Sequence, residues 1–87
     1  MSFKLSILTP SGKAFEGTVD SVGVVGVEGG FEVYGSHVAL LSALSAGPVK
    51  VRKDKTETVF NIDSGVLEVM PNHDVLILAD RILDSKQ

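Results

Sequence analysis

Apolar side chains recur at every second position along much of the chain, which is the spacing of a β-strand that buries one face. In the first such stretch, Phe3, Leu5 and Ile7 share one face. Residues that favour turns, chiefly glycine, proline, asparagine and aspartate, separate most of the stretches. The alternating or apolar stretches lie at residues 3–7, 14–17, 18–27, 31–33, 49–51, 56–62, 66–70 and 75–79. Many short strands joined by regular turns predict an all-β sandwich or barrel.

Residues 38–46 fit two kinds of secondary structure. Val38, Leu41 and Leu44 have the spacing of one helix face. In a strand, however, Val38, Leu40 and Leu44 would lie on one side. Periodicity alone does not decide between the two over so short a run. Because the rest of the chain has a β pattern, we expect a strand or extended structure here.

Two further expectations concern a turn and the end of the chain. Asp54 and Lys55 lie between two alternating stretches, which predicts a hairpin with these residues in its turn. Residues 81–87 are mostly polar, so we expect a short loose tail after one sandwich domain at residues 1–80.

The composition also favours sheet over helix. The chain has 13 Val and 4 Ile against 9 Leu and 5 Ala. β-Branched side chains are stiff and pack well on a pleated surface. With 87 residues, 44% hydrophobic and 22% charged, the chain has the profile of one globular domain and not of a disordered segment.

Charge and cysteine content exclude several classes of protein. The absence of cysteine excludes a disulfide framework and a thiolate metal site. A net charge of −3 is a poor electrostatic match to nucleic acid or anionic lipid. The longest stretch without a charged residue, 33–49, has 17 residues and contains glycine and proline, so it is too short and too broken to span a bilayer. The first residues contain no long apolar block, so we expect no secretory signal, and we expect membrane association only through a partner.

Motifs for catalysis or cofactor binding are not found. His37 and His73 lie 36 residues apart and have no metal-ligand spacing. Gly23 and Gly26 do not fit a dinucleotide-binding motif, and Gly12-Lys13 does not fit a phosphate-binding loop. We therefore expect no catalytic residue, no metal and no cofactor.

Four of the eight basic residues lie close together, at Lys50, Arg52, Lys53 and Lys55. We interpret this cluster as a solvated hairpin tip that protects a sheet edge from aggregation. A phosphate or phospholipid patch is the alternative. No aromatic residue lies among the four, which argues against a single-strand stacking platform.

The segment that begins at Gly26 reads Gly-Val-Glu-Gly-Gly-Phe-Glu-Val-Tyr-Gly-Ser-His-Val-Ala-Leu-Leu-Ser-Ala-Leu. It resembles the signature G-x-E-G-E-F-G-V-x-P-G-H-A-P-L-L-T-A-L of the epsilon subunit of F-type ATP synthase. The likeness extends to residues 8–17, 47–52, 63–69 and 75–80, in the order and spacing of that family. The resemblance implies a flattened ten-stranded β-sandwich in a single domain.

The resemblance also implies a function without bond chemistry. In that family the subunit joins gamma in the central rotor stalk and seats it on the membrane ring of c subunits, so that proton flow drives ATP synthesis. Its place would be peripheral, on the cytoplasmic face of a bacterial inner membrane or the stromal face of a thylakoid. Most members continue beyond the sandwich with an inhibitory helical hairpin. Because this sequence stops at Gln87, we expect a subunit that lacks those helices.

The resemblance assigns contact residues for two partners. Thr9 and His37 match positions that lie toward gamma. A second set of residues matches positions that face the polar loops of the c-ring. This set contains Glu28, Gly29, Gly30, Phe31, Glu32 and Tyr34. Some residues depart from the family pattern. Gly30 replaces a glutamate, Glu32 replaces a glycine, and Gly35-Ser36 replaces Pro-Gly before His37.

A carrier domain is the alternative from another class. Lipoyl and biotinyl domains are all-β units of similar length that display a lysine on a tight hairpin, as Lys55 is displayed here. However, Thr56 stands where lipoyl carriers usually have alanine, and the Met-Lys-Met of biotin carriers is absent.

Overall fold

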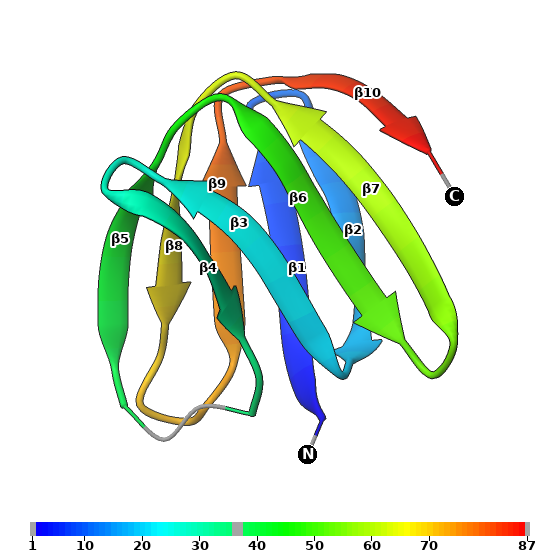
Figure 1. Cartoon of the computed structure of the whole chain (residues 1–87), viewed down its shortest axis with the longest axis vertical. Helices are drawn as coiled ribbons and strands as arrows, with labels where there is room; N and C mark the ends of the chain where they lie inside the picture. Colours follow the sequence, from blue (N-terminus) through cyan, green and yellow to red (C-terminus); the bar gives the residue numbers. More distant parts are fainter. Residues whose placement is uncertain (1, 36–37, 87) are drawn as a thin grey trace.

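Two layers of β-strands make up the molecule (Figure 1). The computed structural model describes residues 2–35 and 38–86, and these residues form ten strands. The front layer of Figure 1 contains β4 (Gly29–Val33), β3 (Ser21–Gly26), β6 (Gly47–Lys53), β7 (Thr56–Ile62) and β10 (Ile82–Lys86). The back layer contains β5 (Leu40–Leu44), β8 (Gly65–Val69), β9 (Val75–Ala79), β1 (Phe3–Thr9) and β2 (Gly12–Val19). The predicted ten-stranded β-sandwich is confirmed.

Hydrogen bonds connect the strands of each layer in an almost wholly antiparallel pattern. The back layer runs in the order β5-β8-β9-β1-β2, and only its β1–β9 pair is parallel. In the front layer, β3 pairs with β4 on one side and with β6 on the other. The layers meet where Gly26 of β3 pairs with Leu44 of β5. This order places β9 between β1 and β8, which fixes the residues that share the outer face of the back layer.

The core lies between the layers and is built from alternate residues of nearly every strand. Leu5, Ile7, Leu67 and Ile77 of the back layer have no exposed surface, and Val22 of the front layer has none either. Burial of such a side chain contributes about 1.5–3 kcal/mol relative to leaving it exposed. The alternating sequence pattern correctly predicted that Leu5 and Ile7 lie on a buried face.

Aromatic packing closes one side of the core, where β2 approaches the front layer. The rings of Phe15 and Phe60 pack edge to face, with 6.0 Å between their centroids. This geometry suits the positive edge and negative face of aromatic rings.

Two local predictions are confirmed. Residues 40–44 form β5, as the β pattern of the neighbouring sequence favoured. β6 and β7 form a hairpin in which Lys53 pairs with Thr56, so Asp54 and Lys55 make the turn. Asp54 has a φ of 56°, which aspartate tolerates better than most residues.

Two other predictions are wrong. The expected single run over residues 18–27 is broken at Asp20, where the backbone amide of Asp20 donates to the Arg52 carbonyl at 2.7 Å. The carboxylate of Asp20 accepts a bond from the Asp54 amide at 2.6 Å, which ties this corner to the hairpin. The expected loose tail is also wrong, because most of it forms β10 and pairs with β7. The neighbouring strand supplies hydrogen-bond partners that a polar sequence does not reveal.

Candidate docking surfaces

The hairpin between β3 and β4 contains most of the residues predicted to contact a c-ring. Its turn lies at Val27 and Glu28, and Glu28, Gly29 and Gly30 are exposed. Gly29 has a φ of 128°, a conformation that side chains with a Cβ rarely adopt. Val27 is 62% exposed at the tip, beside the acidic Glu28. The tip therefore offers an apolar and an acidic side chain together.

The remaining residues of that predicted set lie farther along β4 and have different surroundings. Phe31 is half-buried and packs against the core. Glu32 points to the outer face of the front layer, where its carboxylate accepts a bond from the Tyr34 hydroxyl at 2.9 Å. Tyr34 is 59% exposed and lies at the other end of β4 from the Glu28 turn (Figure 1). The structure thus separates Tyr34 from the tip.

Arginine and tyrosine side chains surround the Glu32 carboxylate. The Arg52 guanidinium lies 3.9 Å from Glu32 and donates to Glu57 at 2.9 Å. The bond to Glu57 is the largest cause that raises the pKa of Arg52. The bond to Glu32 raises the pKa of the Tyr34 hydroxyl above its ordinary value. Arg52 is therefore neutralised by two carboxylates, which weakens the phosphate-patch alternative for the basic cluster.

The structure describes one of the two residues predicted to face gamma, Thr9, and not the other, His37. Thr9 ends β1 and is half-buried. Its hydroxyl donates to the Gly12 carbonyl and accepts from the Ser11 amide, both at 3.1 Å, so it closes the β1–β2 turn. Thr9 also lines a hollow of about 570 Å³ beside Leu8, Val66 and Leu78. His37 and its neighbour Ser36 lie outside the described residues.

A row of apolar side chains crosses the outer face of the back layer, and the sequence prediction did not include it. Because the inward positions alternate with the outward ones, Leu8, Leu78, Val66 and Ala43 all face outward. Their strands place them directly opposite one another: Leu8 pairs with Leu78, Leu78 with Val66, and Val66 with Ala43. We call these four residues the apolar row. Leu78 is 49% exposed.

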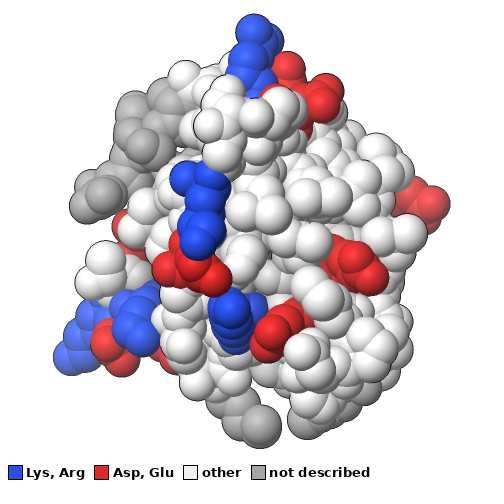
Figure 2. Space-filling model, turned by 180° about the vertical axis from the view of Figure 1, so that it is seen from behind, with Lys and Arg blue, Asp and Glu red and all other residues white. Residues whose placement is uncertain are grey.

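A second row, one step along the strands, is mixed in character. Ser6 pairs with Leu76, Leu76 with Glu68, and Glu68 with Leu41. Leu41 is 71% exposed. Figure 2 shows this side of the molecule as a broad area with few charged residues beside a column of basic and acidic side chains. A face of this kind on a small domain is typical of a protein-docking surface.

The signal for the apolar row was present in the sequence at residues 75–79. Every residue of this strand is apolar, from Val75 to Ala79. A strand that is apolar on both faces is normally covered on both faces. The inward residues meet the core, so the outward residues Leu76 and Leu78 require another cover.

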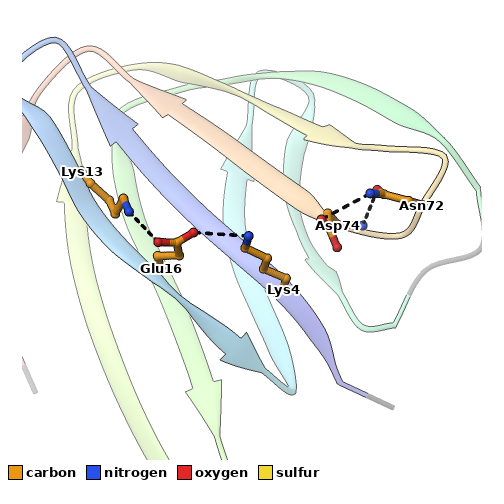
Figure 3. Close-up of polar contacts among 5 residues, drawn as sticks. All are labelled: Lys4, Lys13, Glu16, Asn72 and Asp74. Atoms are coloured by element: carbon orange, nitrogen blue, oxygen red, sulfur yellow. Dashed lines mark hydrogen bonds and ion pairs between the residues drawn. The ribbon is translucent and has the colours of Figure 1, made fainter.

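Charged side chains border the apolar row on β1 and β2. The Glu16 carboxylate bridges two lysines: it lies 3.3 Å from Lys4 Nζ and accepts a hydrogen bond from Lys13 (Figure 3). Figure 3 also shows the turn before β9, where Asn72 Oδ1 accepts from the Asp74 amide at 3.1 Å. The hydrogen bond from Lys13, followed by that from Lys4, lowers the pKa of the Glu16 carboxyl.

Replacing Lys13 by methionine is expected to raise the pKa of Glu16 toward its ordinary value. Lys4→Met should raise it less, because the Lys13 bond is the larger cause. Since the folded-state pKa is lowered, the contribution of this cluster to stability is present above the unfolded pKa of Glu16. It is lost as the pH falls through the folded value. NMR titration of the side-chain carboxyl measures the shift, with Lys50→Met on the other layer as the control. An unchanged Glu16 pKa in Lys13→Met would contradict the assigned cause.

The described part of the chain has neither a metal-binding cluster nor a helix that could span a membrane. Residues 2–35 and 38–86 hold no group of three His, Cys, Asp or Glu side chains placed to bind a metal ion. No helix in this part of the chain is long and apolar enough to cross a membrane.

The ten strands and the apolar row define a small two-layer β-sandwich domain with an exposed apolar face. Residues 2–85 match the family model of the ATP synthase delta/epsilon chain β-sandwich domain. The chain therefore belongs to that family.

Curated relatives agree with this assignment. The chain is 40% identical over 80 residues to the ATP synthase epsilon chain of Chlorobium limicola, and the match covers 91% of each chain. It is 37% identical over 79 residues to the ATP synthase epsilon chain of Shouchella clausii. That match covers 91% of this chain but 59% of the relative. The alternative interpretation as a lipoyl or biotinyl carrier with Lys55 gains no support from these relatives.

Solved structures share the fold. A chain of the Euglena gracilis mitochondrial ATP synthase, solved with OSCP, F1 and the c-ring, matches with a TM-score of 0.86 at 17% identity. The match covers 94% of this chain and 52% of that one. A chain of the Tetrahymena thermophila central stalk and c-ring matches with a TM-score of 0.77 at 15% identity, covering 97% and 67%.

Proposed function

We propose that the chain is a non-catalytic rotor subunit of an F-type ATP synthase, which joins the gamma subunit to the c-ring in the central stalk. Family membership supports the assignment to ATP synthase. The observation that carries the docking role is the apolar row, which crosses four strands on an otherwise sparsely charged face. An uncovered face of this kind fits a subunit that works only in an assembly.

The apolar row is the proposed contact with gamma. Thr9 belongs to the edge of this surface, because it lines the hollow that Leu8, Val66 and Leu78 also line. This placement supports the expectation for Thr9 as a gamma contact, and we propose the same role for His37. The contact would exclude water from Leu78 and Leu41, which are the most exposed leucines of the face. Burial of apolar area at the centre of an interface stabilises it more than rim charges do.

The tip of the β3–β4 hairpin is the proposed contact with the c-ring. Glu28 supplies a negative charge that suits a basic partner loop, and such a rim charge affects the rate of docking more than the affinity. Gly29 and Gly30 allow a close approach of backbone because they have no side chain. Phe31 and Glu32 follow the tip along β4, and Tyr34, beyond the far end of that strand, would contact the c-ring separately from the tip. Membrane association, on the cytoplasmic or stromal face, then follows from the complex.

A binding experiment with purified gamma tests the proposal. The wild-type chain is expected to bind immobilised gamma, and the variant with Lys53→Ala and Lys55→Ala should bind equally well. Both lysines lie at the β6–β7 hairpin of the front layer, away from the apolar row, and Lys53 Nζ donates to the Thr18 carbonyl at 3.0 Å. A tenfold loss of affinity, about 1.4 kcal/mol, would place the basic cluster in the interface and contradict the assigned face. Failure of the wild type to bind would overturn the proposal.

A further inference from the structure

The outer face of the back layer has a pattern that is complementary to itself. Its three central strands are β8, β9 and β1, with the wholly apolar β9 in the middle. Leu8 lies on one side of Leu78 and Val66 on the other, at the same level.

A basic residue, Lys4, lies on β1, and an acidic residue, Glu68, lies on β8. Lys4 also lies 3.3 Å from Glu16 of β2, which is paired with Lys13 as well, so this side of the face keeps a net positive charge. The face therefore carries opposite charges on opposite sides of an apolar centre.

We propose that two copies of the unassembled chain pair face to face through the outer surface of the back layer, with β9 of one copy packed over β9 of its partner. The two-fold axis runs parallel to the strands. The dimer covers the apolar row until gamma replaces the second copy. The pairing itself needs no gamma subunit and so goes beyond the proposed function.

The strand order determines which residues meet in this dimer. Rotation about an axis over β9 places β1 of one copy over β8 of its partner. Leu78 then packs on its own equivalent, and Leu8 packs on Val66 in both directions. Stacked sheets lie about 10 Å apart, so these outward side chains interdigitate.

The charges select this axis over the alternative. Ser6 and Glu68 are both level with Leu76, so Lys4 is displaced from Glu68 by two residues, or about 7 Å along the strand. A lysine side chain spans this offset across the interface and makes two Lys4–Glu68 ion pairs per dimer. An axis perpendicular to the strands would instead stack β8 on β8 and β1 on β1, so Lys4 and Glu68 would not meet across the interface. The loss of both opposite-charge pairs disfavours that arrangement.

The size of the face sets the strength of the dimer. Four strands at a spacing of about 4.8 Å make an interface well below the roughly 1,600 Å² of a standard stable complex. The dimer is therefore weak and forms only at high protein concentration. A weak dimer also leaves the face available to a partner with a larger contact surface.

Sedimentation velocity of the isolated chain, over roughly a hundredfold range of concentration that reaches the millimolar range, tests the inference. The expected result is a shift from the 9.2 kDa monomer toward a species of twice that mass. Leu78→Lys should abolish the shift, because two lysines would meet at the two-fold axis. Lys50→Glu, on the outer face of the front layer, is the matched control and should leave the shift unchanged. Thermal melting of each variant verifies the fold.

A charge exchange separates this dimer from unspecific association. In a Glu16→Gln background, which removes the carboxylate beside Lys4, Lys4→Glu and Glu68→Lys should each weaken the dimer about tenfold, and the double exchange should restore it. A chain that stays monomeric throughout, associates equally well as Leu78→Lys, or is not restored by the double exchange would overturn the inference. None of these measurements involves gamma. Failure of the gamma-binding experiment alone would therefore overturn the proposed function and leave the dimer standing.

Discussion

Gly65→Ala is expected to lower the melting temperature of the chain by roughly 12–24 °C. A Cβ at this position would lie 2.5 Å from the Leu78 carbonyl oxygen and 3.3 Å from the Ala79 Cα. Both atoms belong to the backbone of β9, so the contact is relieved only if the strand moves. Overpacking of this kind costs about 3 kcal/mol, and a domain of this size loses about 4–8 °C per kcal/mol.

Gly23→Ala is the matched control for Gly65→Ala. Gly23 also lies inside a strand, but the nearest atom to its added Cβ is Glu32 Cγ at 3.7 Å, which is ordinary contact. Its free energy of unfolding should change by less than about 0.5 kcal/mol. Calorimetry of the three chains measures the difference. Equal melting temperatures for Gly65→Ala and the wild type would show that β8 and β9 are not packed as closely as described.

Leu78→Lys is expected to weaken binding to gamma at least about a hundredfold while the chain stays folded. The variant places an ammonium group at the centre of the proposed interface, where it must lose water without a partner charge. Because Leu78 is 49% exposed in the isolated chain, the lysine reaches solvent there and the fold is retained. Isothermal titration with gamma measures the affinity, and Lys50→Glu on the other layer is the control. Wild-type affinity for Leu78→Lys would exclude the apolar row from the interface.

The core was predictable from the sequence because alternation is a strong local signal. Leu5 and Ile7 alternate with polar or outward residues, and both are fully buried as expected. The hairpin at Asp54 and Lys55 was predictable for the same reason, since turn residues separate two alternating stretches. These features depend on neighbours in the sequence.

Features that depend on distant residues were not predictable. Asp20 and Ser21 are only a weak local turn signal, and the bonds that fix the break come from Arg52 and Asp54 of the β6–β7 hairpin. The last strand was missed because its hydrogen bonds come from β7. The all-apolar residues 75–79 signalled only the central strand of the apolar row, since the four residues of the row share a face only after β1, β9, β8 and β5 pair.

The placement of the predicted site residues shows the same limit. The resemblance placed Glu28 and Tyr34 in one contact set, yet they lie at opposite ends of β4. Phe31 was placed in that set as well, and it packs partly against the core. Sequence likeness identifies which segments matter, whereas the side of the sheet that each residue faces follows from strand pairing.

The most direct test of the central claim is reconstitution of an F-type ATP synthase from which the epsilon subunit has been removed. Adding the wild-type chain is expected to restore proton-driven ATP synthesis in vesicles, and adding Leu78→Lys should restore little or none. Lys50→Glu should act as the wild type does. Equal rates of synthesis with and without the wild-type chain, in a complex that regains synthesis with its own epsilon subunit, would contradict the account.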